Sequence, residues 1–197
     1  MEKIVNLKNT TNILINLEKA KDRLQDATQA LEILEIPFTR FPAVEHNKGL
    51  IGCGLSHHHL LSQVKPNTLI LEDDVGLTED RNIEWKVPSE ADAIYFGVSD
   101  HGYIRNQRIG YRGTVLVSQY NEKYKRVLNM CSTHAILYLT KKYIESANQV
   151  IVSCLQQGVP FDLGLASIHR HFTILTPNEP LFYQIGQAEF TNLVLKV

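Results

Sequence analysis

One short segment constrains the fold more than any other: an apolar run over residues 68–71 that ends in three consecutive carboxylates, Glu72, Asp73 and Asp74. The run follows the turn signal Pro66-Asn67, and this pattern predicts a buried β-strand. Adjacent carboxylates disfavour one another's ionisation unless a cation or solvent compensates them. Ligands of open α/β sheets bind beyond the carboxyl ends of strands. The segment therefore predicts a ligand site, with a solvated acidic turn as the plainer alternative.

Three oxygen ligands at such a point suit one class of metal ion. Mg²⁺ and Mn²⁺ prefer hard oxygen donors, keep several waters, and take one or two carboxylates together with phosphate oxygens. We therefore expect a bound Mn²⁺ or Mg²⁺ at the end of this strand.

Strands alternate with helices along the rest of the chain. Periodicity predicts a helix with Leu24, Ala27, Leu31 and Leu34 on one face, ended by Pro37. Residues 49–54 read as a loop or helix entry, and the other expected helices cover residues 55–64, 140–157 and 163–170. Further strands are expected over residues 12–17, 38–44, 93–98, 133–139 and 171–176. This alternation predicts an α/β sandwich with a mainly parallel sheet, in one domain over residues 1–197.

Composition excludes several functional classes. The chain has 197 residues, 44% hydrophobic residues and a net charge of −1, which gives no electrostatic footprint for nucleic acid. Its three cysteines are odd in number and widely spaced, so they predict neither a zinc motif nor a disulfide framework. No leader-like segment opens the chain, and no apolar run approaches the roughly 18 residues of a membrane span. A cytoplasmic location is the default expectation.

Several separate motifs follow one another in a fixed order. They are Ile15-Asn16-Leu17 with Arg23, Gly49 to His57 (GLIGCGLSH), Leu71-Glu72-Asp73-Asp74-Val75, Thr133 to Lys142 (THAILYLTKK), Pro160-Phe161-Asp162 and Pro180 to Gln184. Together they resemble the family 25 glycosyltransferases, the lipooligosaccharide and collagen galactosyltransferase group. The match runs from about residue 12 to 192. The chain is shorter than most members, and its middle segment, residues 99–129, does not align.

This resemblance implies a GT-A fold, a Rossmann-like sandwich that binds a nucleotide sugar and, usually, Mn²⁺. It implies transfer of a hexose, most often galactose from UDP-galactose, to a glycan or glycosylated acceptor with inversion. Asp74 would be the firmest metal ligand, Glu72 a second ligand, and Asp73 would reach donor hydroxyls. The segment 99–129, rich in arginine, lysine and tyrosine, would lie on the acceptor side.

The resemblance also gives roles to residues outside the acidic motif. Asn16 and Arg23 would lie near the nucleotide, although Arg23 alternatively pairs with a nearby aspartate. Ser56 and His57 would contact the donor, with a hydrogen bond that ties the helix to the sheet as the alternative for His57.

Inverting transfer needs a general base on the face opposite the leaving group. Asp162, a lone carboxylate that enters a helix in an apolar stretch, is the candidate, and a helix N-cap is its alternative role. His169 or His171 is a further candidate for the metal shell.

Two other functions stay open at this point. The first is a catalytically degenerate GT-A module that binds a nucleotide sugar or a protein partner, which the short length allows. The second is a metal-dependent phosphohydrolase, which lacks a second metal site and an obvious nucleophile in this sequence.

Overall fold

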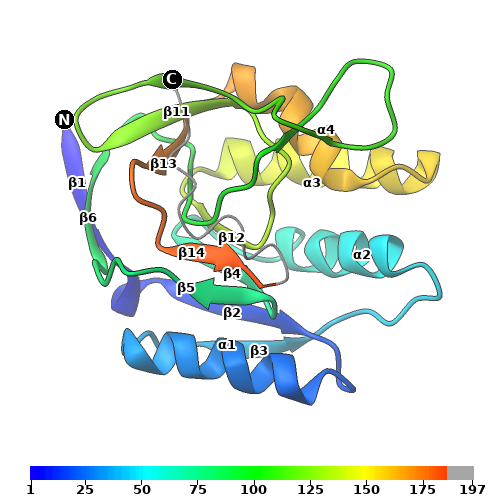
Figure 1. Cartoon of the computed structure of the whole chain (residues 1–197), viewed down its shortest axis with the longest axis horizontal. Coiled ribbons are helices and arrows are strands. Elements are labelled where there is room, and N and C mark those ends of the chain that lie inside the picture. The colour runs from blue at the N-terminus through cyan, green and yellow to red at the C-terminus, as the bar shows by residue number, and fades with distance from the viewer. Residues whose placement is uncertain (186–197) are drawn as a thin grey trace.

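An eight-stranded sheet forms the centre of the protein, shown in Figure 1 as a computed structural model that describes residues 1–185. From edge to edge its strands are β10 (Leu116–Gln119), β11 (Tyr124–Asn129), β13 (Ile174–Pro177), β7 (Ala93–Tyr95), β12 (Ala135–Tyr138), β4 (Thr68–Glu72), β2 (Thr11–Asn16) and β3 (Thr39–Pro42). The expected α/β class is confirmed. The end of the stretch that resembles the glycosyltransferases, residues 186–192, lies outside the described residues.

The sheet is mixed, so the prediction of a mainly parallel sheet is wrong. Strand β2 runs parallel to β3 and β4, and β13 runs parallel to β7, but the other four pairings are antiparallel. Parallel neighbours require a crossover connection, usually a helix. Helices connect β2, β3 and β4, whereas no helix separates β7 from β12.

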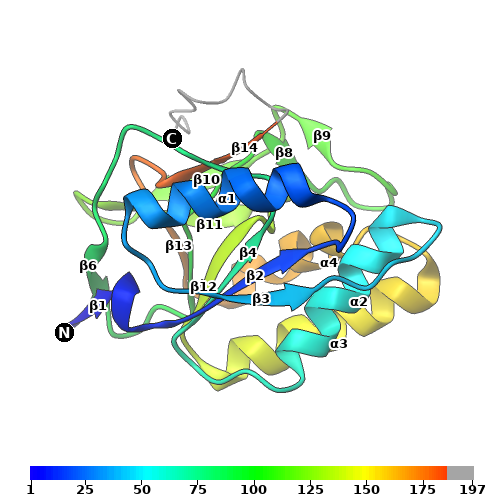
Figure 2. The same ribbon diagram turned by 90° about the horizontal axis from the view of Figure 1, so that it is seen from below.

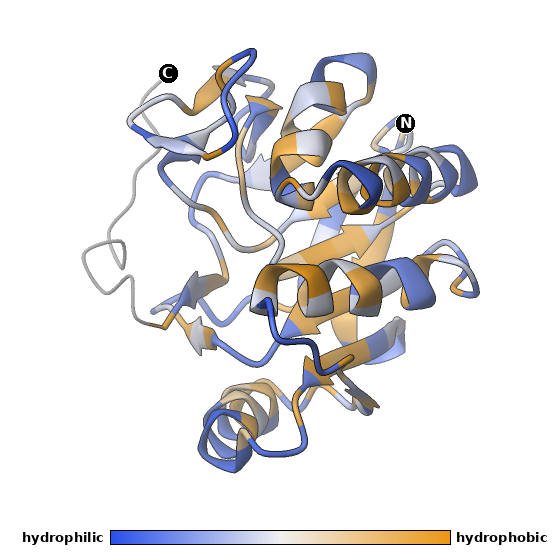
Figure 3. Ribbon diagram, turned by 90° about the vertical axis from the view of Figure 1, so that its right-hand side faces the viewer, coloured by the Kyte–Doolittle hydropathy of each residue, from blue (hydrophilic) through white to orange (hydrophobic). Residues whose placement is uncertain are grey.

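Helices cover both faces of the sheet. Helix α1 (Lys21–Ile33) packs on one face, and α2 (Gly49–Leu61), α3 (Lys141–Gln157) and α4 (Phe161–Ile168) gather on the other (Figures 1 and 2). Strand β4 packs against helices on both faces of the sheet. Leu69 and Leu71 belong to the core cluster that contains α1 residues, whereas Ile70 belongs to the cluster that contains α3 residues. Figure 3 shows the matching pattern, with apolar central strands and hydrophilic outer helix surfaces. Burial on both faces explains the continuous apolar run before Glu72.

Short ribbons that the sequence did not predict surround this sheet. Strand β1 (Glu2–Asn6) pairs with β6 (Glu84–Pro88), and η1 (Leu7–Asn9) follows β1. Strand β5 (Val75–Leu77) pairs with β14 (Phe182–Gln184), directly after the carboxylates. The segment 99–129 forms the β8 (His101–Gly102) and β9 (Tyr111–Arg112) pair as well as β10 and β11. The β5–β14 pairing matters for function, because it brings the end of the described chain back to the acidic motif.

The predicted helices form, with shifts at their ends. Thr140 caps α3 by accepting a hydrogen bond from the Tyr143 backbone, and Gly158 ends it with a φ of 64°. Helix α2 begins at Gly49 rather than residue 55, so its glycines are helical. A Cβ at Gly52 would lie 2.5 Å from the Val44 carbonyl oxygen, which explains the glycine there. Helix α4 begins at Phe161, two residues before the expected start.

Within residues 1–185, no helix combines the length and the apolar character that a membrane crossing requires.

Candidate functional site

The order of the strands defines a crevice at one end of the sheet. From β2 the chain passes through α1 to β3 on one side, then returns through α2 to β4 on the other side of β2. This reversal is a topological switch point, where open α/β sheets bind ligands beyond the carboxyl ends of their strands. A cavity of about 310 Å³ lies there, lined among others by Asn16, Arg23, Gly49, Cys53, Glu72, Asp73 and Asp74. Five of the predicted site residues therefore come together in one pocket.

Asp73 is held by two side chains from β2 and α1. The Asn16 amide Nδ2 donates a hydrogen bond of 2.7 Å to Asp73 Oδ2, and Arg23 Nη1 lies 3.1 Å from Asp73 Oδ1. Arg40 Nε in turn donates to Asn16 Oδ1 at 2.9 Å, which fixes the amide orientation. Arg23 does pair with an aspartate, but this is Asp73 of the acidic motif rather than a neighbour on its own helix, and Arg23 itself lines the pocket. Because the Arg23 side chain is still 47% exposed, it keeps donors free for a ligand in the pocket.

Asp74 has fewer compensating contacts than Asp73. Its Oδ2 accepts a 2.8 Å hydrogen bond from Gln184 Nε2, but its buried Oδ1 has no hydrogen-bond partner among the described residues. Burial and the neighbouring charge of Glu72 raise the pKa of Asp74 to about 6, although the Gln184 bond opposes this rise. A carboxylate oxygen left bare in a buried acidic environment suits a cation.

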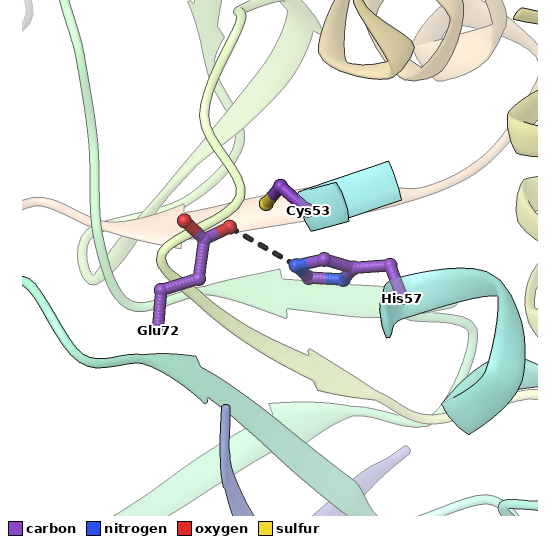
Figure 4. Close-up of side chains that lie close together, drawn as sticks. All are labelled: Cys53, His57 and Glu72. Carbon is purple, nitrogen blue, oxygen red and sulfur yellow. Dashed lines mark hydrogen bonds and ion pairs between the residues drawn. The ribbon is translucent and has the colours of Figure 1, made fainter. Parts of the chain in front are cut away.

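Glu72 belongs to a small cluster with Cys53 and His57 (Figure 4). His57 Nε2 lies 3.0 Å from Glu72 Oε1, and one potential ligand atom from each of the three residues lies within 4.8 Å of the others. Burial raises the pKa of Glu72, but hydrogen bonds from His57 and Thr133 outweigh it, so the pKa falls below its usual value. His57 is fully buried and joins α2 to β4, as the alternative role predicted.

Two sets of ligand atoms are thus available to a metal ion. Glu72 and Asp74 offer only oxygen, as Mg²⁺ and Mn²⁺ prefer, whereas Cys53, His57 and Glu72 offer the mixed donors typical of zinc. A histidine that binds a metal normally donates its second ring N–H to an acceptor. The second nitrogen of His57, Nδ1, is buried without a partner in the described structure. This argues against zinc at Cys53, His57 and Glu72, the group of potential ligands whose atoms lie close together in residues 1–185, and the bare Oδ1 of Asp74 offers a further oxygen in the same pocket.

Ser56 does not line the pocket. It is fully buried, and its hydroxyl donates to the Gly52 carbonyl at 2.8 Å and accepts from the Val44 backbone N–H at 2.8 Å. These bonds join α2 to the segment after β3. The structure therefore gives Ser56 a role in positioning α2 rather than the predicted contact with a donor.

Asp162 lies in the first turn of α4, and Pro160 occupies the N-cap position. The alternative N-cap role of Asp162 is therefore wrong, although its Oδ1 accepts a 2.9 Å bond from the Leu163 backbone N–H. Burial and the charge of Glu72 raise the pKa of Asp162, while the Leu163 bond opposes the rise. Glu72, Asp74 and Asp162 all raise the pKa of the Cys53 thiol, after burial itself. Asp162 does not line the pocket, but its charge contributes to the raised pKa of Cys53, which does.

The late histidines do not join the acidic residues. His169 is fully buried, and its Nε2 lies 3.0 Å from the Tyr95 hydroxyl. His171 is exposed, and neither histidine belongs to the cluster of potential metal ligands. No contact within residues 1–185 joins either histidine to the acidic residues, and η2 (His169–His171) packs against β11 and α4.

Two residues of the site had no predicted role. Cys53 precedes His57 by four residues, and this helical spacing places both side chains on one face of α2. The spacing was a usable signal. Gln184 lies 110 residues from Asp74, and only the pairing of β14 with β5 brings the two together.

No model of a known protein family matches the chain, and a search of curated proteins gives no match either. Function therefore has to be inferred from the geometry of the site.

Proposed function

We propose that this protein is a metal-dependent glycosyltransferase that moves a hexose from a UDP-sugar to a glycan or glycosylated acceptor with inversion. The observation that carries the proposal is that Glu72, Asp73 and Asp74 line one cavity at the switch point between β2 and β4. The sequence resemblance to family 25 glycosyltransferases favours galactose as the hexose.

The pocket has the groups that a nucleoside diphosphate sugar requires. Its volume of about 310 Å³ falls at the lower end of the range for small-molecule sites, roughly 300–1,000 Å³. Arg23 presents an exposed guanidinium to the pocket for the diphosphate, and the Arg40–Asn16–Asp73 chain of hydrogen bonds holds the pocket wall in one arrangement. Such fixed polar groups orient a ligand at low entropic cost.

Glu72 and Asp74 would hold the divalent ion, Mn²⁺ or Mg²⁺. When bound, it would supply Lewis-acid stabilisation of the charge that develops on the departing diphosphate. The support for these ligands is the bare Oδ1 of Asp74, together with the absence of a cationic side chain bonded to Asp74 in residues 1–185. Asp73, which is ion-paired with Arg23 and accepts a hydrogen bond from Asn16, is left to bind donor hydroxyls.

Asp162 is the proposed general base for the acceptor hydroxyl. Its carboxylate is largely buried, and its raised pKa makes it a stronger proton acceptor than a solvated aspartate. Its position in the first turn of α4 is rigid, because Phe161 and Leu163 on either side are buried in the core. A protein that only binds a nucleotide sugar needs no such base, so Asp162 separates the enzyme from the non-catalytic alternative.

Calorimetry and thermal shift with nucleotide sugars test this proposal. UDP-sugars should bind in the presence of Mn²⁺ and stabilise the fold more than GDP- or CMP-sugars, by an amount set by concentration over dissociation constant. Asp74→Asn should no longer bind UDP-sugars more tightly when Mn²⁺ is present. The control Asp26→Asn, at an exposed position of α1, should bind like wild type. If Mn²⁺ left the binding of UDP unchanged in all three proteins, the metal role would be refuted. If a GDP-sugar raised the melting temperature more than a UDP-sugar, the proposal of a UDP-sugar donor would be refuted.

A further inference from the structure

A concave region that shares no lining residue with the acidic pocket lies along α4. It consists of two cavities, of about 610 and 300 Å³, which share Tyr103 and Ser167 in their walls. The segment 103–108, helix α3 and helix α4 line the larger cavity, and α4 and the end of β11 line the smaller one. We call this region the α4 cleft. Its size suits a sugar or a short oligosaccharide.

The α4 cleft is basic, and residues 1–185 contribute no carboxylate to its walls. Arg108 lines the larger cavity, Arg105 and Arg170 line the smaller one, and neither wall includes an aspartate or glutamate. All three arginines are exposed, and none forms an ion pair within residues 1–185. In a chain with 20 basic and 21 acidic residues, this is a local excess of positive charge. Scattered exposed arginines would need no explanation, but these three line the two adjoining cavities of the α4 cleft.

The wall of the α4 cleft is held in place by specific contacts. Asn129 accepts a 2.7 Å hydrogen bond from the Tyr103 backbone N–H and donates to the Tyr103 carbonyl at 2.9 Å. Tyr103 also packs against Cys131, Leu163 and Ala166. A Cβ at Gly102 would lie 2.3 Å from the Thr114 carbonyl oxygen, so the backbone there packs closely. Tyr103 and the backbone that precedes the arginine-bearing segment are therefore fixed by packing and hydrogen bonds before any ligand binds.

The position of the α4 cleft relates it to the proposed reaction. Leu163, the residue after Asp162, lines the larger cavity, while Asp162 acts electrostatically on Cys53 in the acidic pocket. The first turn of α4 thus borders the cleft through Leu163. Asp162 itself lines neither cavity, so the reacting hydroxyl of an acceptor held in the cleft would have to extend past the cleft wall to reach it.

We propose that the α4 cleft binds a glycan acceptor that carries an oxyanion, a carboxylate or a phosphate ester, which Arg105, Arg108 and Arg170 recognise. This inference rests on the proposed function and names the class of acceptor. The planar guanidinium matches both oxyanions through paired hydrogen bonds. Tyr103 and the uncharged polar side chains of the cleft are left to contact the neutral part of the sugar.

Surface plasmon resonance on three matched surfaces tests the inference: a β-galactoside, the corresponding galacturonide and a phosphorylated galactoside. At physiological ionic strength, wild-type protein should bind at least one charged surface at least about tenfold more tightly than the neutral one, since hydrogen bonds to charged groups contribute roughly 1.5–3 kcal/mol. The two charged surfaces distinguish a carboxylate acceptor from a phosphorylated one. The variant R105Q/R108Q/R170Q should lose the preference.

A matched variant excludes non-specific attraction. K65Q/K86Q/K123Q removes the same charge from exposed lysines that line neither cavity, and should keep the preference. Equal loss in both variants, equal binding to all three surfaces, or no binding to any of them would overturn the inference. Because all six residues are exposed, both variants should melt close to wild type.

Binding of UDP-sugar in the acidic pocket is measured separately. Charged glycans that bind without any binding of a UDP-sugar would refute the glycosyltransferase and keep the oxyanion site. The reverse result would refute the oxyanion site alone.

Discussion

Asp74→Asn should make the metal-free protein more stable while removing its proposed metal site. Burial and Glu72 raise the pKa of Asp74 from 3.8 to about 6, which means that the fold disfavours the charged carboxylate. A difference of about two pKa units corresponds to about 3 kcal/mol at a pH above both values. Asparagine carries no charge, and its side-chain oxygen can still accept the Gln184 hydrogen bond. We therefore expect a gain of up to about 3 kcal/mol in the free energy of unfolding.

The sign of the pH dependence follows from the raised pKa. Above about pH 6 the folded protein bears the full penalty of the ionised Asp74, and below about pH 4 the group is protonated in both the folded and unfolded states. The advantage of Asp74→Asn should therefore be largest near pH 8 and should fade as the pH falls from 6 to 4. For a chain of this length, 3 kcal/mol corresponds to a rise in Tm of roughly 6–12 °C.

Urea denaturation of wild type, Asp74→Asn and the exposed control Asp26→Asn, each in EDTA from pH 4 to pH 8, measures this difference. Adding Mn²⁺ at about a hundred times its dissociation constant should stabilise wild type by about 2.7 kcal/mol and leave Asp74→Asn unchanged. The variant would then lose most of its advantage. An Asp74→Asn protein that is no more stable than wild type at pH 8, or one that Mn²⁺ stabilises equally, would refute the argument.

Three further results are expected. Asp162→Asn should lower turnover by roughly 10²–10⁴-fold and leave UDP-sugar affinity near wild type, as kinetics and calorimetry would show, and a change within about threefold would exclude Asp162 as the base. Gly97→Ala should cost about 1–3 kcal/mol on urea denaturation, because its Cβ would lie 2.0 Å from the buried His134 Nε2, whereas Gly49→Ala, with open space around it, should not. Burial lowers the pKa of His169 to about 3, so protonation of the unfolded chain should reduce stability as pH falls below 6.5; His169→Gln should flatten this slope, and an unchanged slope would contradict it.

Local signals were sufficient for the elements that rest on local physics. The helix over residues 140–157 was predictable from its period, its threonine cap and its terminal glycine, and α3 (Lys141–Gln157) agrees closely. The strand before the carboxylates was equally clear, because both of its faces are buried and its apolar run is unbroken. Burial pattern and capping are properties of a few neighbouring residues, so one sequence is enough to show them.

Strand direction and strand partners could not be predicted in the same way. An apolar run of four residues, such as β12 (Ala135–Tyr138), indicates a strand but not whether it runs parallel or antiparallel to its neighbours. Strands β10 and β11 in the segment 99–129 were not predicted. In β11, Lys125 and Arg126 interrupt the apolar pattern of a strand that joins the main sheet. Pairing between distant segments decides these features, and no local period records it.

The three carboxylates of the acidic motif look equivalent in the sequence, and the fold makes them different. Arg23 forms an ion pair with Asp73, Asn16 donates a hydrogen bond to it, and the His57 ring pairs with Glu72. Within residues 1–185, the Asp74 carboxylate accepts a hydrogen bond from the neutral amide of Gln184 and keeps one buried oxygen without a partner. A cation that enters the pocket therefore gains most at Asp74, because there it replaces no existing protein contact. The resemblance to glycosyltransferases names the same residue as the firmest ligand, and the charge distribution of the fold supplies an independent physical reason for that choice.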